Sequence, residues 1–150
     1  NVSYDPDNHE YMVRLRQAKI DGIADDLPPL VVEDPSGRAK VLVVGWGSSY
    51  GPISAAARRV RLSGRAVATL HLRHLNPLPA DLGDILRRYD RVIVPEMNLG
   101  QLAMILRAKY LVDCESYSRV RGLPISLSEL AEDLIDVIDE KTPNEPKEGR

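Results

Sequence analysis

The sequence predicts a three-layer α/β domain, with a mostly parallel five-stranded sheet, helices on both faces and one antiparallel edge strand. Short apolar segments alternate with helical segments from residue 40 onward, which is typical of parallel β-α-β units. Residues 41–44 and 92–94 are apolar at every position, as in strands covered on both faces. The short apolar segment at 30–33 comes before a turn and is predicted to be the antiparallel edge.

The first 37 residues are predicted to form a helix, a short strand and a turn. Asp5 and Pro6 suit the N-cap and the first helical position. The helix should end before Pro28, because proline cannot continue it. Residues 34–37, Asp-Pro-Ser-Gly, place proline and glycine at turn positions after the strand at 30–33. The apolar stripe of this helix consists of Met12, Leu15, Ile20, Ile23 and Leu27.

Strands and helices alternate in the next part of the chain. The predicted elements are strands at 41–45, 66–72, 91–95 and 112–120, and helices at 52–62, 81–89 and 99–110. Ser63 and Gly64 form the stop signal of the first of these helices. The last of the strands is recognised by its alternating apolar and polar residues. One face of the second helix carries Leu82, Ile85 and Leu86.

The last predicted helix begins at Ser126, and a tail follows it. Ser126 and Glu129 have the spacing of a capping box. Residues 141–150 contain two prolines and no apolar periodicity, so this tail is predicted to be disordered. We expect a linker and helix at 1–28, the α/β domain at 29–140 and the tail at 141–150. The apolar stripe of the last helix is Leu127, Leu130, Leu134 and Ile138.

Composition and charge exclude several kinds of partner. The net charge is -2 and the isoelectric point is about 5.9, which gives no electrostatic reason to bind nucleic acid or an anionic membrane. No apolar run approaches the roughly 18 residues of a membrane-spanning helix. The one cysteine, Cys114, excludes an internal disulfide and a cysteine-ligated cluster within this chain. We therefore expect the cytoplasm as its compartment.

Gly45 and Gly47 stand between a predicted strand and a predicted helix, as glycines do in phosphate-binding loops. Tyr50 replaces the third glycine of a dinucleotide loop, no Walker lysine follows, and the acidic residue expected about twenty positions later is missing. Backbone amides at the helix start, beside Ser48, are still able to hold an anion. Two interpretations stay open: a tight strand-to-helix turn, or a nucleotide- or anion-binding loop at 45–51.

The segment at 95–102, Pro-Glu-Met-Asn-Leu-Gly-Gln-Leu, follows a buried strand and begins a helix. We expect it at the carboxyl edge of the parallel sheet, where α/β proteins place their sites. Glu96 gives that edge a carboxylate, and Asn98 suits a helix cap. Gly100 allows close approach of another backbone, and Gln101 should project from the first helical turn. These residues either cap and pack the helix or contact a ligand or another subunit.

The sequence shows no complete catalytic or metal-binding set. His71 and His74 are three residues apart, but they lie at a strand end and in a loop bounded by Pro77 and Pro79, so their side chains should diverge. Cys114 has no histidine near it in the sequence and is predicted to be a small buried strand residue. No Gly-x-Ser-x-Gly nucleophile motif occurs. We predict no metal site and no catalytic residue in this chain.

Five segments together carry a family resemblance that covers residues 5–138. They are DPDNHEYMVRLRQAKI, VLVVGWGSSYGP, HLRHLNPLP, VIVPEMNLGQLAMILRAKYL and GLPISLSEL. In this order they resemble the C-terminal part of the α subunit of 2-oxoacid:ferredoxin oxidoreductases, and are most similar to the 2-oxoglutarate enzyme of the actinobacterial type. The resemblance implies a domain related to the transketolase C-terminal domain, with a mixed five-stranded sheet.

The resemblance also implies the chemistry of a larger complex. Such a complex converts 2-oxoglutarate, coenzyme A and oxidised ferredoxin to succinyl-CoA, carbon dioxide and reduced ferredoxin. It uses thiamine diphosphate, magnesium and an iron–sulfur cluster, none of them expected in this chain, which lacks the Gly-Asp-Gly motif and the cluster cysteines. In such families these groups belong to the β subunit.

The implied role of this chain is assembly. The chain begins with Asn1 rather than Met, so a pyrimidine-binding domain is expected to precede it. Its implied partners are the rest of the α subunit and the β subunit, in an oligomer. The residues leave open which 2-oxoacid is used, because the substrate pocket is expected in other domains.

Overall fold

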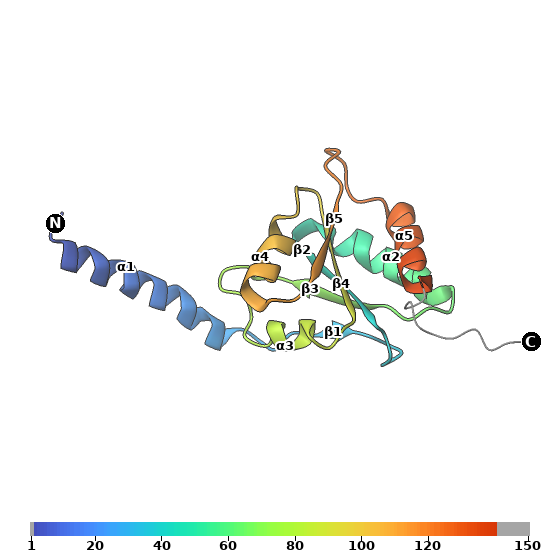
Figure 1. Ribbon diagram of the computed structural model, residues 1–150, viewed down its shortest axis with the longest axis horizontal. Helices are drawn as coiled ribbons and strands as arrows, with labels where there is room; N and C mark the ends of the chain where they lie inside the picture. Colours follow the sequence, from blue (N-terminus) through green and yellow to red (C-terminus); the bar gives the residue numbers. More distant parts are fainter. Residues whose placement is uncertain (1, 141–150) are drawn as a thin grey trace, which may run out of the picture.

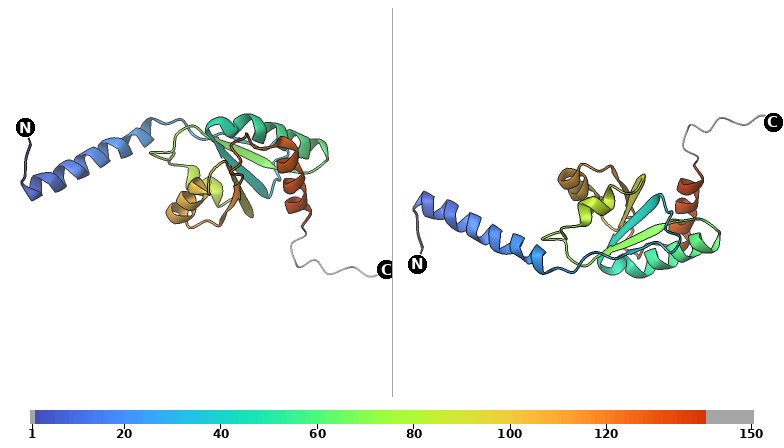
Figure 2. Two further views of the ribbon diagram at one scale, coloured as in Figure 1. Left: turned by 90° about the horizontal axis from the view of Figure 1, so that it is seen from above. Right: turned by 90° about the horizontal axis from the view of Figure 1, so that it is seen from below.

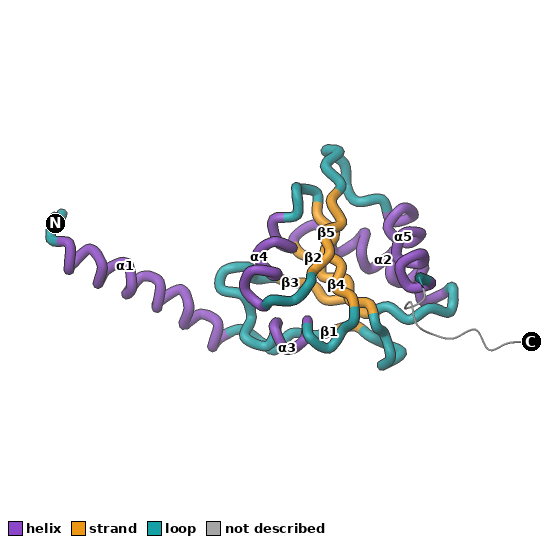
Figure 3. Tube along the Cα trace, viewed as in Figure 1, coloured by secondary structure: helices purple, strands orange, loops and turns teal. Residues whose placement is uncertain are grey.

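A five-stranded sheet forms the centre of the computed structural model, which describes residues 2–140 (Figure 1). The strands lie in the order β1-β3-β2-β4-β5, and β1 pairs with β3 antiparallel while the other neighbours are parallel. Figure 3 shows the strands side by side between the helices. The predicted α/β fold with an antiparallel edge is therefore confirmed. The strands are β1 Val32–Glu33, β2 Val41–Trp46, β3 Ala68–Leu72, β4 Arg91–Glu96 and β5 Cys114–Ser118.

The central strand β2 supplies side chains to two separate hydrophobic cores. Leu42 and Val44 point into one core, and Val41 and Val43 point into the other. Each of these side chains is at most 4% exposed. Successive side chains of a strand point to opposite faces, so an apolar run is needed when both faces are covered. This is why residues 41–44 lack the alternation of a half-exposed strand.

Helices cover both faces of the sheet (Figure 2). On one face, α2 (Tyr50–Leu62) packs beside α5 (Leu127–Asp139). On the other face lie the short α3 (Leu82–Leu86) and α4 (Gln101–Tyr110). The buried small side chains of α2 allow α5 to lie close, because they add little width between the helices. The buried residues where α2 and α5 meet the sheet include Ala56, Ala57, Leu130 and Leu134.

The N-terminal helix α1 (Pro6–Asp21) extends away from the sheet and its covering helices (Figures 1 and 2). It begins as predicted, since the Asp5 carboxylate accepts a hydrogen bond from the Asp7 N–H at 3.1 Å. A 3₁₀ turn, Gly22–Asp26, continues toward Pro28. The helix predicted to reach Pro28 ends at Asp21, so the predicted apolar stripe is divided: Met12, Leu15 and Ile20 lie on α1, whereas Ile23 and Leu27 lie in and after the 3₁₀ turn. No residue of α1 is buried.

Several elements are shorter than predicted. The strands predicted at 30–33 and 66–72 and the helix predicted at 99–110 begin later, at residues 32, 68 and 101. The helix predicted at 81–89 ends at Leu86, because the N–H groups of Asp90 and Arg91 donate to the Lys40 carbonyl and the chain must already turn into β4. The strand predicted at 112–120 ends at Ser118, where the next residue is held by carboxylates of α5.

The predicted tail at 141–150 lies outside the described residues. The division of the chain at residues 28 and 140 stays a prediction.

We expect the Cys114 thiol to be unreactive in the folded protein. It is completely buried, and burial raises its pKa to about 11, so thiolate is scarce at pH 8. A thiol-exchange reagent such as DTNB should modify the native protein only as fast as the protein unfolds, and should modify one thiol per chain at once in urea. Rapid stoichiometric modification of the native protein would contradict this.

Candidate functional site

The seven residues predicted as site candidates lie at the carboxyl edge of the sheet, at the ends of two strands and in the segments that follow them. The loops follow β2 and β4, which are neighbouring parallel strands. The connection from β2 leads to β3 on one side, and the next strand, β4, lies on the other side. This is the topological switch point at which open α/β sheets bind ligands. The first loop carries Gly45, Gly47 and Ser48, and the second leads from Glu96, Asn98 and Gly100 into Gln101.

The glycine loop is closed by its own hydrogen bonds. The Trp46 N–H donates to Ser49 Oγ at 3.0 Å, and Ser49 Oγ donates to the Trp46 carbonyl at 2.7 Å. A Cβ on Gly45 would lie 2.5 Å from Ile53 Cδ1, so a larger residue there would force the Ile53 side chain to move. Gly47 has a φ of +56°, the left-handed conformation that the turn requires. The Ser48 side chain is exposed and makes none of these contacts. This geometry favours the tight-turn interpretation.

Glu96 anchors the second loop with a buried carboxylate, only 1% exposed. One carboxylate oxygen accepts from the Leu102 N–H at 2.9 Å and from the Asn98 amide at 3.0 Å. The other accepts from the Ala103 N–H at 3.1 Å. The carboxylate thus lies at the N-terminus of α4, where free N–H groups and the helix dipole favour a negative charge.

Asn98 and Gly100 complete the start of α4. Asn98 Oδ1 accepts from the N–H groups of Gly100 at 2.8 Å and Gln101 at 3.1 Å, which is the cap expected from the sequence. Gly100 has a φ of +86°, and a Cβ there would lie 2.4 Å from Ser116 Oγ. The expected close approach therefore occurs, between α4 and β5. Gln101 differs from these residues because its side chain is exposed on the first turn.

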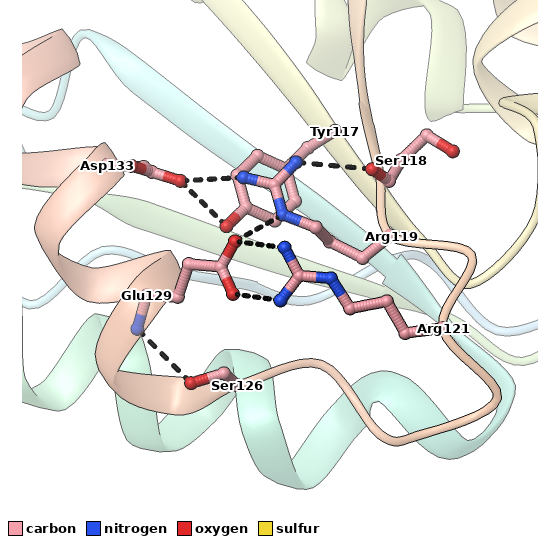
Figure 4. A network of polar contacts seen from close by, with 7 residues as sticks. All are labelled: Tyr117, Ser118, Arg119, Arg121, Ser126, Glu129 and Asp133. Carbon is pink, nitrogen blue, oxygen red and sulfur yellow. Dashed lines mark hydrogen bonds and ion pairs between the residues drawn. The ribbon is translucent and has the colours of Figure 1, made fainter.

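A polar network ties the loop after β5 to α5 (Figure 4). The Arg119 guanidinium donates to Glu129 at 2.6 Å and to Asp133 at 2.9 Å, and it stacks 3.9 Å from the centre of the Tyr117 ring. The Tyr117 hydroxyl donates to Asp133 at 2.8 Å. Burial, together with that carboxylate, raises the pKa of Tyr117. Arg121 adds a second ion pair to Glu129 at 3.2 Å.

The network corrects one prediction and is joined to the loop after β4. Ser126 Oγ accepts from the Glu129 N–H at 3.3 Å, but the Glu129 side chain binds the two arginines, so only half of the predicted capping box is seen. The Arg119 N–H donates to the Glu96 carbonyl at 2.9 Å, and the Ser118 hydroxyl donates to the Asn98 carbonyl. The contacts of Arg119 with Glu129 and Asp133 were not predicted. Their signal was the spacing of Glu129 and Asp133, four apart on one helix, opposite a segment with two arginines.

The two histidines lie in different surroundings. His71 lies edge-on against Tyr50, with ring centres 5.1 Å apart, whereas His74 is exposed. Burial, with the nearby charge of Arg73, lowers the pKa of His71. Both histidines line a cleft of about 600 Å³ between the segment at 27–31, α2 and the end of β3. Within residues 2–140, no group of three or more possible metal ligands comes together.

The fold, the two loops and the comparisons with known proteins agree on one family. The chain belongs to the family described as pyruvate:ferredoxin oxidoreductase core domain II, whose model matches residues 39–130. It is 58% identical, over 130 residues and 87% of its length, to 2-oxoglutarate oxidoreductase subunit KorA of Mycobacterium tuberculosis. It is also 34% identical, over 92% of its length, to 2-oxoacid:ferredoxin oxidoreductase 1 subunit alpha of Aeropyrum pernix.

A solved structure shows the same architecture. The 2-oxoglutarate:ferredoxin oxidoreductase from Magnetococcus marinus, with 2-oxoglutarate, coenzyme A and succinyl-CoA bound, matches 91% of this chain with a TM-score of 0.81 and 32% identity. The chain spans 24% of that protein, and 20% and 23% of the M. tuberculosis and A. pernix relatives.

These comparisons confirm the family expected from the five sequence segments. They give no support to a stand-alone nucleotide-binding module, in agreement with the closed glycine loop. None of the helices within residues 2–140 has the length and hydropathy needed to cross a membrane.

Replacing Glu96 with glutamine should destabilise the domain by about 2 to 3 kcal/mol, because an amide hydrogen would face the Ala103 N–H and the charge at the helix N-terminus would be lost. Urea unfolding followed by circular dichroism measures the change. The matched control is Glu132→Gln, at an exposed position on α5. Equal stability of the two variants would show that Glu96 does not anchor α4.

Glu115 should contribute to acid sensitivity. Arg91 donates hydrogen bonds to both of its oxygens, at 2.7 and 2.8 Å, and thereby lowers its pKa. A lowered pKa gives stability above the unfolded-state value of about 4.3, which is lost as the pH falls through the folded-state value. We therefore expect Glu115→Gln to lower the free energy of unfolding at pH 7, by under about 1 kcal/mol because the pair is partly exposed. The difference in stability between the variant and the original protein should vanish on acidification. Unfolding curves from pH 7 to pH 3 test this, and a difference that grows in acid would contradict it.

Proposed function

We propose that this chain is the C-terminal, non-catalytic assembly domain of the α subunit of a 2-oxoglutarate:ferredoxin oxidoreductase. In the whole complex, 2-oxoglutarate, coenzyme A and oxidised ferredoxin would yield succinyl-CoA, carbon dioxide and reduced ferredoxin. The observation that carries the proposal is the 58% identity to the M. tuberculosis subunit over most of the chain. The shared architecture with the M. marinus enzyme supports it.

The chemistry of the sheet edge supports a structural role. The Glu96 carboxylate already accepts three hydrogen bonds and is buried, which suits anchoring and not proton transfer. The Cys114 thiol is buried and has a raised pKa, which does not suit nucleophilic attack. The ionic groups of Arg119 and Glu129 are paired with each other. The polar groups of this edge therefore hold loops in place for contact with a neighbour.

The residues of this chain do not fit the cofactors expected in the complex. An iron–sulfur cluster needs several cysteines, and the chain has one. Magnesium and thiamine diphosphate need a carboxylate-bearing motif, yet Glu96 is fully engaged within the domain and no metal-ligand group forms within residues 2–140. We therefore assign thiamine diphosphate, magnesium and the cluster to the β subunit. The cytoplasm remains the expected compartment.

The contact role falls mainly to Gln101. Asn98 and Gly100 determine the conformation of the loop, and the Glu96 carboxylate holds it by a hydrogen bond from Asn98. These three residues therefore position the backbone and do not themselves contact the neighbour. The exposed Gln101 side chain is available to a neighbour at the switch point. The proposed partners are the rest of the α subunit and the β subunit, in an oligomer.

A segment exchange tests the proposal. The matching segment of the M. tuberculosis subunit is replaced by this chain, and the hybrid is purified with its partner subunit. We expect ferredoxin reduction that depends on 2-oxoglutarate and coenzyme A, and no turnover by the isolated chain. Turnover by the isolated chain, or a hybrid that assembles but is inactive, would overturn the proposal.

The same hybrid tests the contact role. Gln101→Ala should lower activity or assembly about fivefold, as expected when one hydrogen bond of about 1 kcal/mol is lost. Gln17→Ala is the matched control, because Gln17 bonds only to Asp21 of its own helix. Wild-type assembly and turnover of the Gln101 variant would remove this residue from the interface.

A further inference from the structure

The segment between β5 and α5 has little apolar burial to hold it in place. Residues 120–124 are all exposed, including the large apolar side chains of Val120 and Leu123. Their backbone groups make no hydrogen bond within residues 2–140. Ile125, at the end of the segment, enters the hydrophobic core beneath α2 and α5. A segment with exposed backbone and few buried apolar contacts opens at a low cost in free energy, unless other interactions hold it.

Two arginines hold this segment against α5 by ion pairs (Figure 4). At its start, Arg119 pairs with both Glu129 and Asp133, which are four residues apart on α5. Two residues further along, Arg121 pairs with Glu129 again. The side chains of Arg119 and Glu129 are still 28% and 30% exposed. Ion pairs that solvent can reach in this way are weakened by dissolved salt.

The start of the segment also holds the loop that caps α4. The Arg119 N–H donates to the Glu96 carbonyl at 2.9 Å, and the Ser118 hydroxyl donates to the Asn98 carbonyl. Asn98 Oδ1 in turn accepts from two N–H groups at the start of α4. A continuous series of polar contacts therefore leads from α5 to the start of α4.

The start of α4 has a cap and an anchor, and they differ in burial. The cap is Asn98, which is half-buried and has a second hydrogen bond, from its amide to Glu96. The anchor is the Glu96 carboxylate, which is 1% exposed and accepts from the N–H groups of Leu102 and Ala103. The anchor takes no part in the ion pairs of α5. Opening of the segment after β5 should therefore loosen the cap and leave the anchor in place.

We propose that residues 119–124 form an ionic strap, which opens locally when salt screens its pairs with α5 and then loosens the Asn98 cap of α4. At 1 M salt the screening length is about 3 Å, comparable to the length of the pairs themselves. The closed strap orders the edge of the sheet on which Gln101 is exposed. In the open state that edge gains freedom while both hydrophobic cores stay folded. The inference rests on contacts within the described chain and is independent of the proposed function.

Amide hydrogen exchange of the 150-residue chain, resolved by NMR, tests the proposal because each contact has its own N–H group. Arg119→Gln removes both pairs at the start of the strap. After correction for intrinsic rates, the N–H at position 119 should exchange about fivefold faster, the size expected for partly exposed ion pairs. The capped N–H groups of Gly100 and Gln101 should also exchange faster. Those of Leu102, at the anchor, and Val43, in the central strand, should not change.

Salt and two further variants complete the test. Raising NaCl from about 0.05 M to about 1 M should speed exchange at position 119 in the original protein, and much less in Arg119→Gln, which has already lost two of the screened pairs. Arg119→Lys keeps the charge but not the planar fork or its stacking on a ring, so its rate should lie between the two. The matched control is Arg65→Gln, because Arg65 pairs with Asp139 at the other end of α5 and does not touch the strap.

Three results would overturn the proposal. The first is unchanged exchange at position 119 in Arg119→Gln, or an equal change in Arg65→Gln. The second is a uniform rise that includes Val43, which would indicate global loss of stability and no local opening. The third is faster exchange at position 119 without any change at Gly100 and Gln101, which would separate the strap from the cap of α4. Activity of the whole complex enters none of these measurements, so they leave the proposed function unaffected.

Discussion

The buried carboxylate of Glu96 determines how the second half of the domain is arranged. Its side chain accepts hydrogen bonds from two N–H groups of α4, and its carbonyl accepts one from Arg119. One residue thus sets the end of β4, the start of α4 and the path of the chain after β5. Because a buried carboxylate without partners is costly, its donors must stay in place, and α4 is held at a fixed distance from the sheet. The close contact of Gly100 with Ser116 follows from that distance.

The order and type of the elements could be predicted because their signals are local. The alternation of apolar and helical segments identifies the parallel units, and the caps at Asp5 and Ser126 mark two helix starts correctly. The loop from Glu96 to Gly100 was also located correctly, since a strand end followed by Asn and Gly has few conformations open to it. The sequence left two roles open for these residues: capping and packing the helix, or contacting a ligand or another subunit. The structure shows the capping, and the contact remains a proposal.

The long-range contacts could not be predicted from one sequence. Arg119 meets Asp133 only because the fold brings the loop after β5 against α5, and neither residue alone indicates its partner. The capping box at Ser126 was half wrong for the same reason, since distant arginines compete for the Glu129 carboxylate. The stripe on α1 shows a different limit. Periodicity indicates which side of a helix is apolar, but it does not say which surface covers that side.

The separation of the two hydrophobic cores has a consequence for how this chain can change. Val43 and Val44 are adjacent in sequence, yet their side chains lie on opposite sides of the sheet and share no core. Substitutions that share no contacts have nearly additive effects on stability. The backbone of the sheet therefore acts as a partition. The side chains of one hydrophobic core can be replaced in evolution while the other core keeps its original packing.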